Sequence, residues 1–157
     1  MKKTALLMLL ILVSSLTQAE WSHTENIDLI TDADTSLVVT SATAANGISG
    51  DPSLIIRCAN NDFEVIIVWD EYVDNEDRMV VVDRFDSNDA NGGVTWSAST
   101  NGRAAFAPDV YKRDLVEFFK SGTKYTVMTV DYNDTPMTAQ FSLIGFSAQY
   151  AKLGCSI

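Results

Sequence analysis

Short apolar stretches alternate with clusters of polar, turn-forming residues through most of the 157-residue chain. Stretches of this length that are rich in β-branched and aromatic residues are typical of β-strands. The pattern predicts strands over residues 36–43, 53–59, 63–68, 79–85, 94–99, 103–106, 124–132 and 137–144. Polar clusters at residues 60–62, 100–102 and 133–136 predict tight turns that join neighbouring strands.

One segment, residues 110–120, has helical spacing. Its charged side chains fall on one side and its apolar side chains roughly on the other, the apolar set being Val110, Leu115, Phe118 and Phe119. Asp109 is the predicted N-cap and Gly122 the predicted stop. A second, short helix is predicted within residues 146–153. The predicted fold is mainly β: a β-sandwich or a strongly curved antiparallel sheet with one docked α-helix and a short C-terminal helix.

Residues 1–19 are typical of a cleavable secretory signal. Lys2 and Lys3 precede an apolar run over residues 5–13, and Thr17 and Ala19 occupy the recognition positions of signal peptidase. The apolar run is shorter than the roughly 20 residues that a membrane-spanning helix requires. Cleavage after Ala19 predicts a single β-rich domain over residues 20–157, periplasmic or secreted and without a membrane span.

The charge of the chain limits its partners. The formal net charge is −10, and removal of the two lysines of the predicted signal makes it −12. This balance argues against binding to nucleic acid or anionic lipid, because both require a basic surface. A basic protein partner or cations remain compatible with it, as does a simple role of the charge in solubility.

The chain contains two cysteines, Cys58 and Cys155. In an oxidising compartment, an isolated pair of this kind predicts one disulfide bond. The bond would join a core strand to the extreme C-terminus. The alternative of a redox-active pair lacks the close CxxC spacing.

No catalytic residue, cofactor site or metal site is predicted. The one histidine, His23, lies with Trp21 in an N-terminal segment that we expect to fray, whereas a catalytic base must be held firmly. Residues 86–97 do not match a calcium-binding loop of the EF type, because Asn91 and Ser97 occupy the positions that require glycine and glutamate. A looser calcium site in residues 86–93 or 70–77 remains an alternative. Trp69 and Trp96 are predicted core residues.

Two arginines stand inside apolar strands, where an unpaired charge is costly. For Arg57 and Arg84 we predict ion pairs at the edge of the core, with Asp70 and Asp83 as the nearby carboxylates. The alternative is that these arginines are exposed and contact a ligand.

Several segments taken in order resemble the type VI secretion-associated periplasmic protein family, described as VasI- or TagO-like. They are LIIRC at 54–58, the strand ending at Trp69, VVVDRFD at 80–86, WSASTNGRAAF at 96–106, LVEFFKSGTKYTV at 115–127, and AQFSLIGF at 139–146 followed by Cys155. The resemblance implies an exported, non-enzymatic accessory domain with a protein partner in the cell envelope, such as a secretion-system component. By position, Cys58 and Cys155 match the paired cysteines of that family, and Arg84, Trp96 and Ser97 match its recurrent polar and aromatic positions.

The sequence therefore predicts a periplasmic accessory domain that binds protein through edge strands and acidic loops. Two alternatives stay open. One is a carboxylate-dependent hydrolase of cell-wall polymer, which needs two carboxylates facing one cleft. The other is a calcium-stabilised secreted module from a phage or another mobile element.

Overall fold

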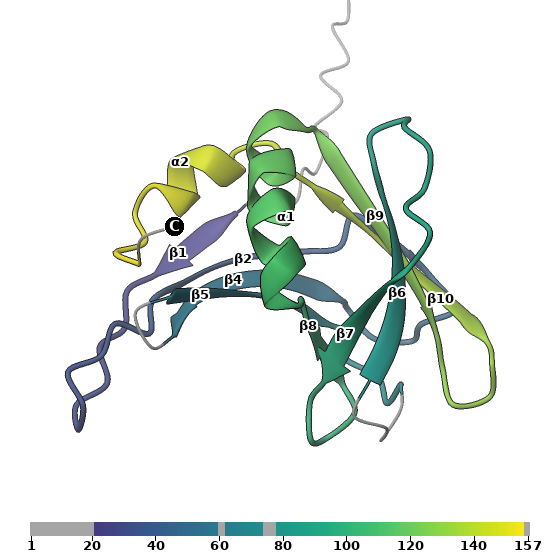
Figure 1. The fold of residues 1–157 in the computed structure, drawn as a ribbon, viewed down its shortest axis with the longest axis horizontal. Coiled ribbons are helices and arrows are strands. Elements are labelled where there is room, and N and C mark those ends of the chain that lie inside the picture. Colours follow the sequence, from purple (N-terminus) through teal and green to yellow (C-terminus); the bar gives the residue numbers. More distant parts are fainter. Residues whose placement is uncertain (1–20, 60–61, 74–77, 156–157) are drawn as a thin grey trace, which may run out of the picture.

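The computed structural model describes residues 21–59, 62–73 and 78–155, so the predicted signal lies outside the described residues. The fold is mainly β, with ten strands and two helices in this part of the chain (Figure 1). The strands are β1 (Ser22–Thr24), β2 (Leu37–Ser41), β3 (Ala44–Asn46), β4 (Ser53–Ala59), β5 (Asp62–Val68), β6 (Arg78–Phe85), β7 (Val94–Ala98), β8 (Ala104–Phe106), β9 (Lys124–Val130) and β10 (Pro136–Ser142). The helices are α1 (Asp109–Ser121) and α2 (Phe146–Tyr150).

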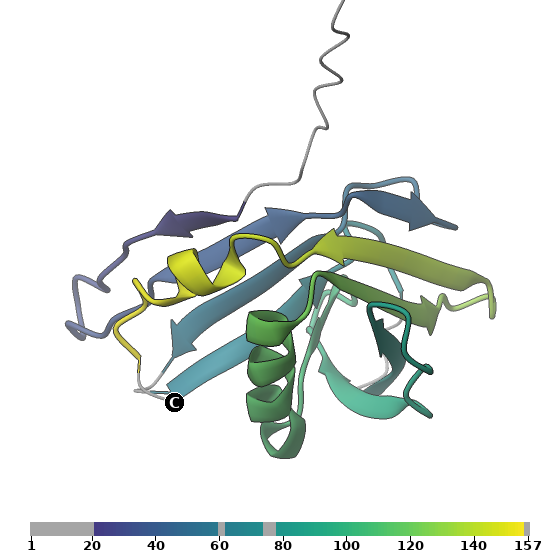
Figure 2. The ribbon, with the colours of Figure 1, turned by 90° about the horizontal axis from the view of Figure 1, so that it is seen from above.

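All ten strands belong to one antiparallel sheet, in the order β1-β2-β4-β5-β8-β7-β6-β9-β10-β3. The sheet bends strongly, so that β1, β2, β4 and β5 form one arm and β6, β9 and β10 form the other (Figure 2). Only two residues separate β2 from β3, yet β2 lies near one end of the strand order and β3 lies at the other end. The two arms of the sheet therefore approach each other at this point. Thr43 N–H donates to the carbonyl of Gln140 at 2.7 Å at this approach. The curved sheet, rather than the sandwich, is therefore the correct alternative.

The three predicted turns each join an antiparallel pair. Strands β4 and β5 pair up to Ala59 and Asp62, and residues 60–61 between them lie outside the described residues. Strands β7 and β8 are joined through Gly102, whose φ of 65° favours glycine. Strands β9 and β10 are joined by a turn in which Asp131 N–H donates to the carbonyl of Thr135.

Helix α1 spans the opening between the two arms of the sheet (Figures 1 and 2). Its buried residues, Lys112, Leu115, Val116 and Phe119, follow the i, i+3, i+4, i+7 spacing of one helix face. The predicted apolar face was therefore partly wrong, because Val110 is 90% exposed and Phe118 is 45% exposed. The N-cap is Pro108 instead of Asp109, whose carboxylate pairs with Lys112 at 2.9 Å.

The N-terminal segment is part of the folded domain, so our expectation that it frays was wrong for the residues from Trp21 onward. The Trp21 side chain is 2% exposed, and its indole N–H donates to the carbonyl of Ser142 at 2.9 Å. Its ring lies 4.8 Å from that of Phe146 in α2. His23 follows in β1, opposite Val38 of β2. The short polar sequence of β1 carries no strand pattern of its own, and packing of the adjacent tryptophan holds it in place.

The predicted disulfide bond between Cys58 and Cys155 is present. It joins β4 to the segment that follows α2, across 97 positions of sequence. Trp69 and Trp96 are fully buried, as predicted. Within the described residues, no helix is both long enough and apolar enough to cross a membrane.

Candidate functional site

Large apolar side chains lie on the outside of the sheet where β6 and β9 pair. Val80 is 60% exposed, Met128 37% and Val130 44%. Since side chains alternate between the two faces of a strand, these residues share one face while Val81 and Val127 point into the core. The register places Val82 opposite Met128. We call the surface formed by Val80, Val82, Met128 and Val130 the outer β6–β9 face.

A shallow apolar groove of about 200 Å³ lies at one end of the outer β6–β9 face. Val82 and Met128 line it, together with Thr126, Thr138 and Arg84. The exposed guanidinium of Arg84 therefore stands beside a largely apolar depression. This combination suits an apolar side chain of a partner with a carboxylate close by.

A second hollow, of about 400 Å³, lies between β6, the loop at residues 86–93 and helix α1. Asp83 lines its inner wall and is 2% exposed. The Tyr111 hydroxyl donates to the Asp83 carboxylate at 2.9 Å, and the Tyr125 hydroxyl donates to it at 3.0 Å. Because Tyr111 belongs to α1 and Tyr125 to β9, this carboxylate ties the helix to the sheet.

Burial raises the pKa of Asp83, and hydrogen bonds from Tyr111 and Tyr125 partly oppose that rise. Burial, together with the negative charge of Asp83, also raises the pKa of both tyrosines, so their hydroxyls remain donors at neutral pH. Asp89 and Asp114 line the same hollow. The single Tyr111 hydroxyl lies within hydrogen-bond distance of both Asp83 oxygens, and the Tyr125 hydroxyl donates to one of them, which fits a structural connection better than a free acid or base.

Replacement of Asp83 by asparagine should change how stability depends on pH. A carboxyl group whose pKa is raised by folding stabilises the folded state fully below its ordinary pKa of about 3.9, and that contribution is lost as the pH rises through the folded-state pKa. The free energy of unfolding of the wild type, relative to D83N, should therefore fall as the pH rises from about 4 to neutrality. Urea denaturation across this pH range measures the difference in unfolding free energy between the two proteins. The other carboxylates are the same in both proteins, so their contributions cancel in this difference. Parallel pH profiles for the two proteins would show that the buried carboxylate has no such linkage.

The predicted site residues do not form one cluster. Arg57 pairs with Glu64, its neighbour across β4 and β5, at 2.6 Å, and neither Asp70 nor Asp83 is its partner. Asp83 and Arg84 point to opposite faces of β6, which separates the buried carboxylate from the exposed guanidinium.

Trp96 and Ser97 are likewise divided between the two faces of β7. The Trp96 side chain is buried in the core, whereas Ser97 is exposed. The groove beside Arg84 could not be predicted from the sequence. Its apolar residues are typical of any strand, and only the pairing register of the strands places them next to one another.

The first carboxylate of the acidic loop at residues 86–93 is occupied by hydrogen bonds within the protein. The Asp86 carboxylate accepts hydrogen bonds from the backbone N–H groups of Thr123 and Lys124 and from the Thr123 hydroxyl. The Thr123 hydroxyl bond is the main cause of its lowered pKa. Within residues 21–59, 62–73 and 78–155, no group of three potential metal ligands is assembled. Residues 74–77 of the other acidic stretch lie outside the described residues.

The predicted binding surface at the sheet edges is small. The two edge strands, β1 and β3, each contain three residues. Short edges of this kind limit pairing with another strand. The outer β6–β9 face offers more apolar surface and is therefore the stronger candidate.

Part of the chain is similar to a known protein family. The sequence profile of the family described as Invasion associated locus B (IalB) protein matches residues 80–154. The match covers 75 of the 157 residues, just under half of the chain, and includes the outer β6–β9 face. Neither the curated proteins nor the solved structures gave a match.

This finding overturns the resemblance to the type VI secretion-associated family. The segments at 80–86, 96–106, 115–127 and 139–146, on which that resemblance mainly rested, all lie within the region that matches the IalB family. In the structure they are strands and the main helix, so they reflect the packing of this fold. The chain is similar to IalB proteins over this region.

Proposed function

We propose that the mature chain is an exported, envelope-associated domain that binds another protein and catalyses no reaction. The N-terminal sequence supports export, and so do the disulfide bond and the similarity to the IalB family. The link to type VI secretion is no longer part of this proposal.

The outer β6–β9 face is the observation that carries the binding role. Most exposed apolar side chains of a soluble protein are scattered singly, whereas clusters of them mark interaction sites. Here Val80, Met128 and Val130 gather on two paired strands, and a groove with an arginine at its side adjoins them. The face lies within the region similar to IalB proteins.

The test is a comparison of captured proteins. The mature domain, immobilised in wild-type form and as V80E/M128E, is incubated with periplasmic extract of the host bacterium. Bound proteins are then identified by mass spectrometry. We expect V80E/M128E to lose a defined envelope protein, because a glutamate cannot be buried in an apolar interface without a partner.

A matched control is V110E, which places the same charge on α1 at a side chain that is 90% exposed. This variant should retain the captured protein. Identical recovery by the wild type and V80E/M128E would contradict the proposal, provided that thermal unfolding shows all three proteins to be folded.

A further inference from the structure

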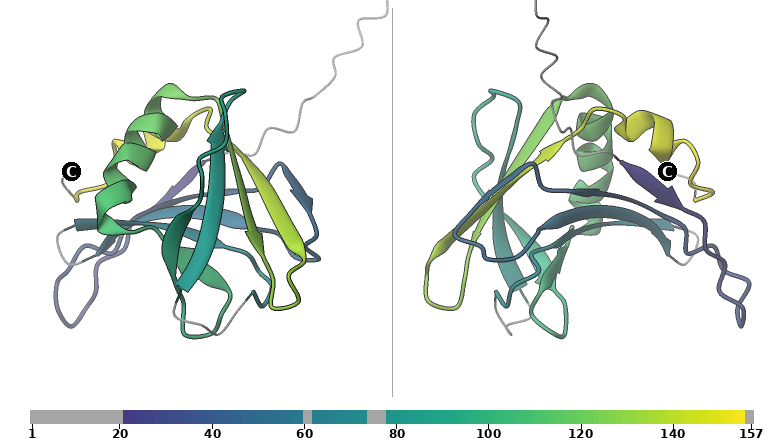
Figure 3. Two further views of the ribbon diagram at one scale, coloured as in Figure 1. Left: turned by 45° about the vertical axis from the view of Figure 1, so that its right-hand side comes forward. Right: turned by 180° about the vertical axis from the view of Figure 1, so that it is seen from behind.

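The connection between β1 and β2 carries the two most exposed large apolar side chains of the described residues. Leu29 is 95% exposed and Ile30 is 93% exposed. The connection projects beyond the rest of the domain (Figure 3). Two adjacent aliphatic side chains that contact so little of their own protein contribute little to its folding. Their exposure therefore calls for another explanation.

The tip of this loop is ordered by its own hydrogen bonds. One oxygen of the Asp28 carboxylate accepts from the backbone N–H groups of Ile30 and Thr31 and from the Thr31 hydroxyl, at 2.8 to 2.9 Å. Asp28 N–H donates to the carbonyl of Ala33, and Asp32 N–H donates to the carbonyl of Asp28. The backbone that carries the two apolar side chains is thus fixed before any partner arrives.

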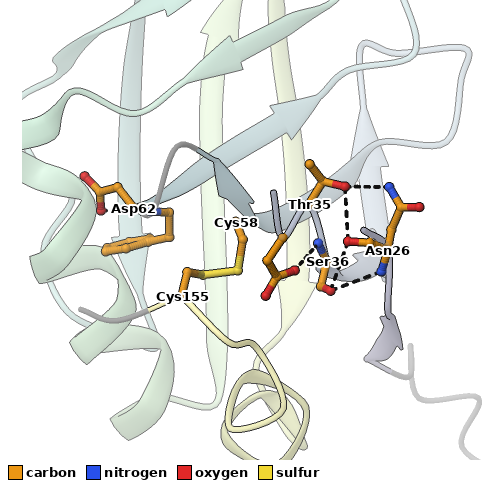
Figure 4. The surroundings of a disulfide bond; sticks show 8 residues. Asn26, Thr35, Ser36, Cys58, Asp62 and Cys155 are labelled. Carbon is orange, nitrogen blue, oxygen red and sulfur yellow. Dashed lines mark hydrogen bonds between the residues drawn. A yellow bond between two sulfur atoms is a disulfide. The ribbon is translucent and has the colours of Figure 1, made fainter. Parts of the chain in front are cut away.

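The base of the loop is held beside the disulfide bond (Figure 4). The side chain of Asn26 donates to the Thr35 hydroxyl, and the Ser36 N–H donates to the Asp34 carboxylate. Ser36 in turn accepts a hydrogen bond from the backbone N–H of Cys58 at 2.9 Å. A loop that is rigid at base and tip loses little conformational freedom on binding, which favours affinity.

From these features we propose that Leu29 and Ile30 insert into an apolar pocket of a partner protein whose rim carries lysine or arginine. This inference rests on the proposed role in protein binding and adds a second contact to it. The charges of the loop select the rim: Glu25, Asp28, Asp32 and Asp34 lie within the loop and its base, and the sequence has no lysine or arginine from residue 21 to residue 56. Arg57, which lines a hollow together with Asp28, is paired with Glu64.

The same charges argue against two other occupants. Anionic lipid headgroups would be repelled by the four carboxylates. A second copy of the chain also fits poorly, because its formal net charge is −10. Hydrogen bonds, chiefly from Thr31 N–H to Asp28 and from Ser36 to Asp34, lower the pKa of both carboxyl groups, so the loop remains negative at neutral pH.

A photo-crosslinking amino acid at position 29 of the full chain, produced in the host bacterium, identifies the protein in contact with the tip. The same amino acid at position 128 reports on the outer β6–β9 face, and at position 110 it serves as the control. The crosslinked protein is then purified, and its affinity is measured for the wild type, L29S/I30S and V110S.

We expect L29S/I30S to weaken binding by about tenfold or more, as truncation of central interface residues does, and V110S to change it by less than about twofold. D32N, which keeps a residue suited to the φ of 56° at this position, should weaken binding at low salt and less so at high salt.

Thermal unfolding should be unchanged in all three variants, since their side chains are exposed. Equal affinity of L29S/I30S and V110S overturns the inference, as does crosslinking at position 128 without crosslinking at position 29. That second result leaves the proposed function intact, whereas no crosslink at either position contradicts both. Binding to vesicles of phosphatidylethanolamine and phosphatidylglycerol (3:1) in place of a protein would also overturn it.

Discussion

Removal of the disulfide bond should cost this domain a large part of its stability. The double variant C58A/C155A is expected to lose about 4–5 kcal/mol of unfolding free energy, because the bond closes a loop of ~100 residues and so restricts the unfolded chain. Total stabilities of small domains are about 5–15 kcal/mol. Urea denaturation of the oxidised wild type and of the variant measures the loss.

Reduction provides the control for this prediction. A reductant should destabilise the wild type by a similar amount and leave C58A/C155A unchanged, since the variant has no bond to reduce. A loss below about 1 kcal/mol would contradict the prediction, because it would show that the disulfide bond adds little to the stability that packing of the C-terminal segment already provides. The same experiment bears on the loop that carries Leu29, because its base is hydrogen-bonded to Cys58 through Ser36.

Replacement of Trp21 should have the second large effect. The W21A variant is expected to lose about 3–5 kcal/mol of unfolding free energy, since removal of a buried aromatic side chain leaves a cavity. It also leaves the buried carbonyl of Ser142 without the indole N–H that it accepts. Calorimetry of the mature chain measures the loss.

The neighbouring substitution S22A is the matched control, because Ser22 follows Trp21 directly and is exposed at the start of β1. It should change stability by less than about 0.5 kcal/mol. A W21A protein as stable as S22A would contradict the packing described for β1. Cleavage after Ala19 would leave Trp21 as the second residue of the mature chain, close to a free end and yet part of the core.

The strands could be predicted where local pattern and packing agree. The predicted strand at 53–59 coincides with β4, and its apolar residues alternate between buried and partly exposed positions. By contrast, β1 and β3 are short and polar, and they pair because other parts of the chain place them at the ends of the sheet. Periodicity cannot reveal such strands, since their cause is non-local.

The candidate site shows the same division. The disulfide bond followed from a count of cysteines and a predicted compartment. The outer β6–β9 face did not follow, because Val80 and Met128 are equally typical of buried strand positions and their exposure depends on which face the core occupies. Exposure of Leu29 and Ile30 was missed because apolar residues usually indicate the core, whereas a turn held by hydrogen bonds to Asp28 keeps these two side chains outside it.

The central claim is that this domain works by binding a protein through the outer β6–β9 face. The most direct measurement is a calorimetric titration of the purified partner against the wild type, V80E/M128E and V110E. We predict that V80E/M128E binds at least about a hundredfold more weakly, while V110E binds as the wild type does. Equal affinities of all three folded proteins would contradict the claim.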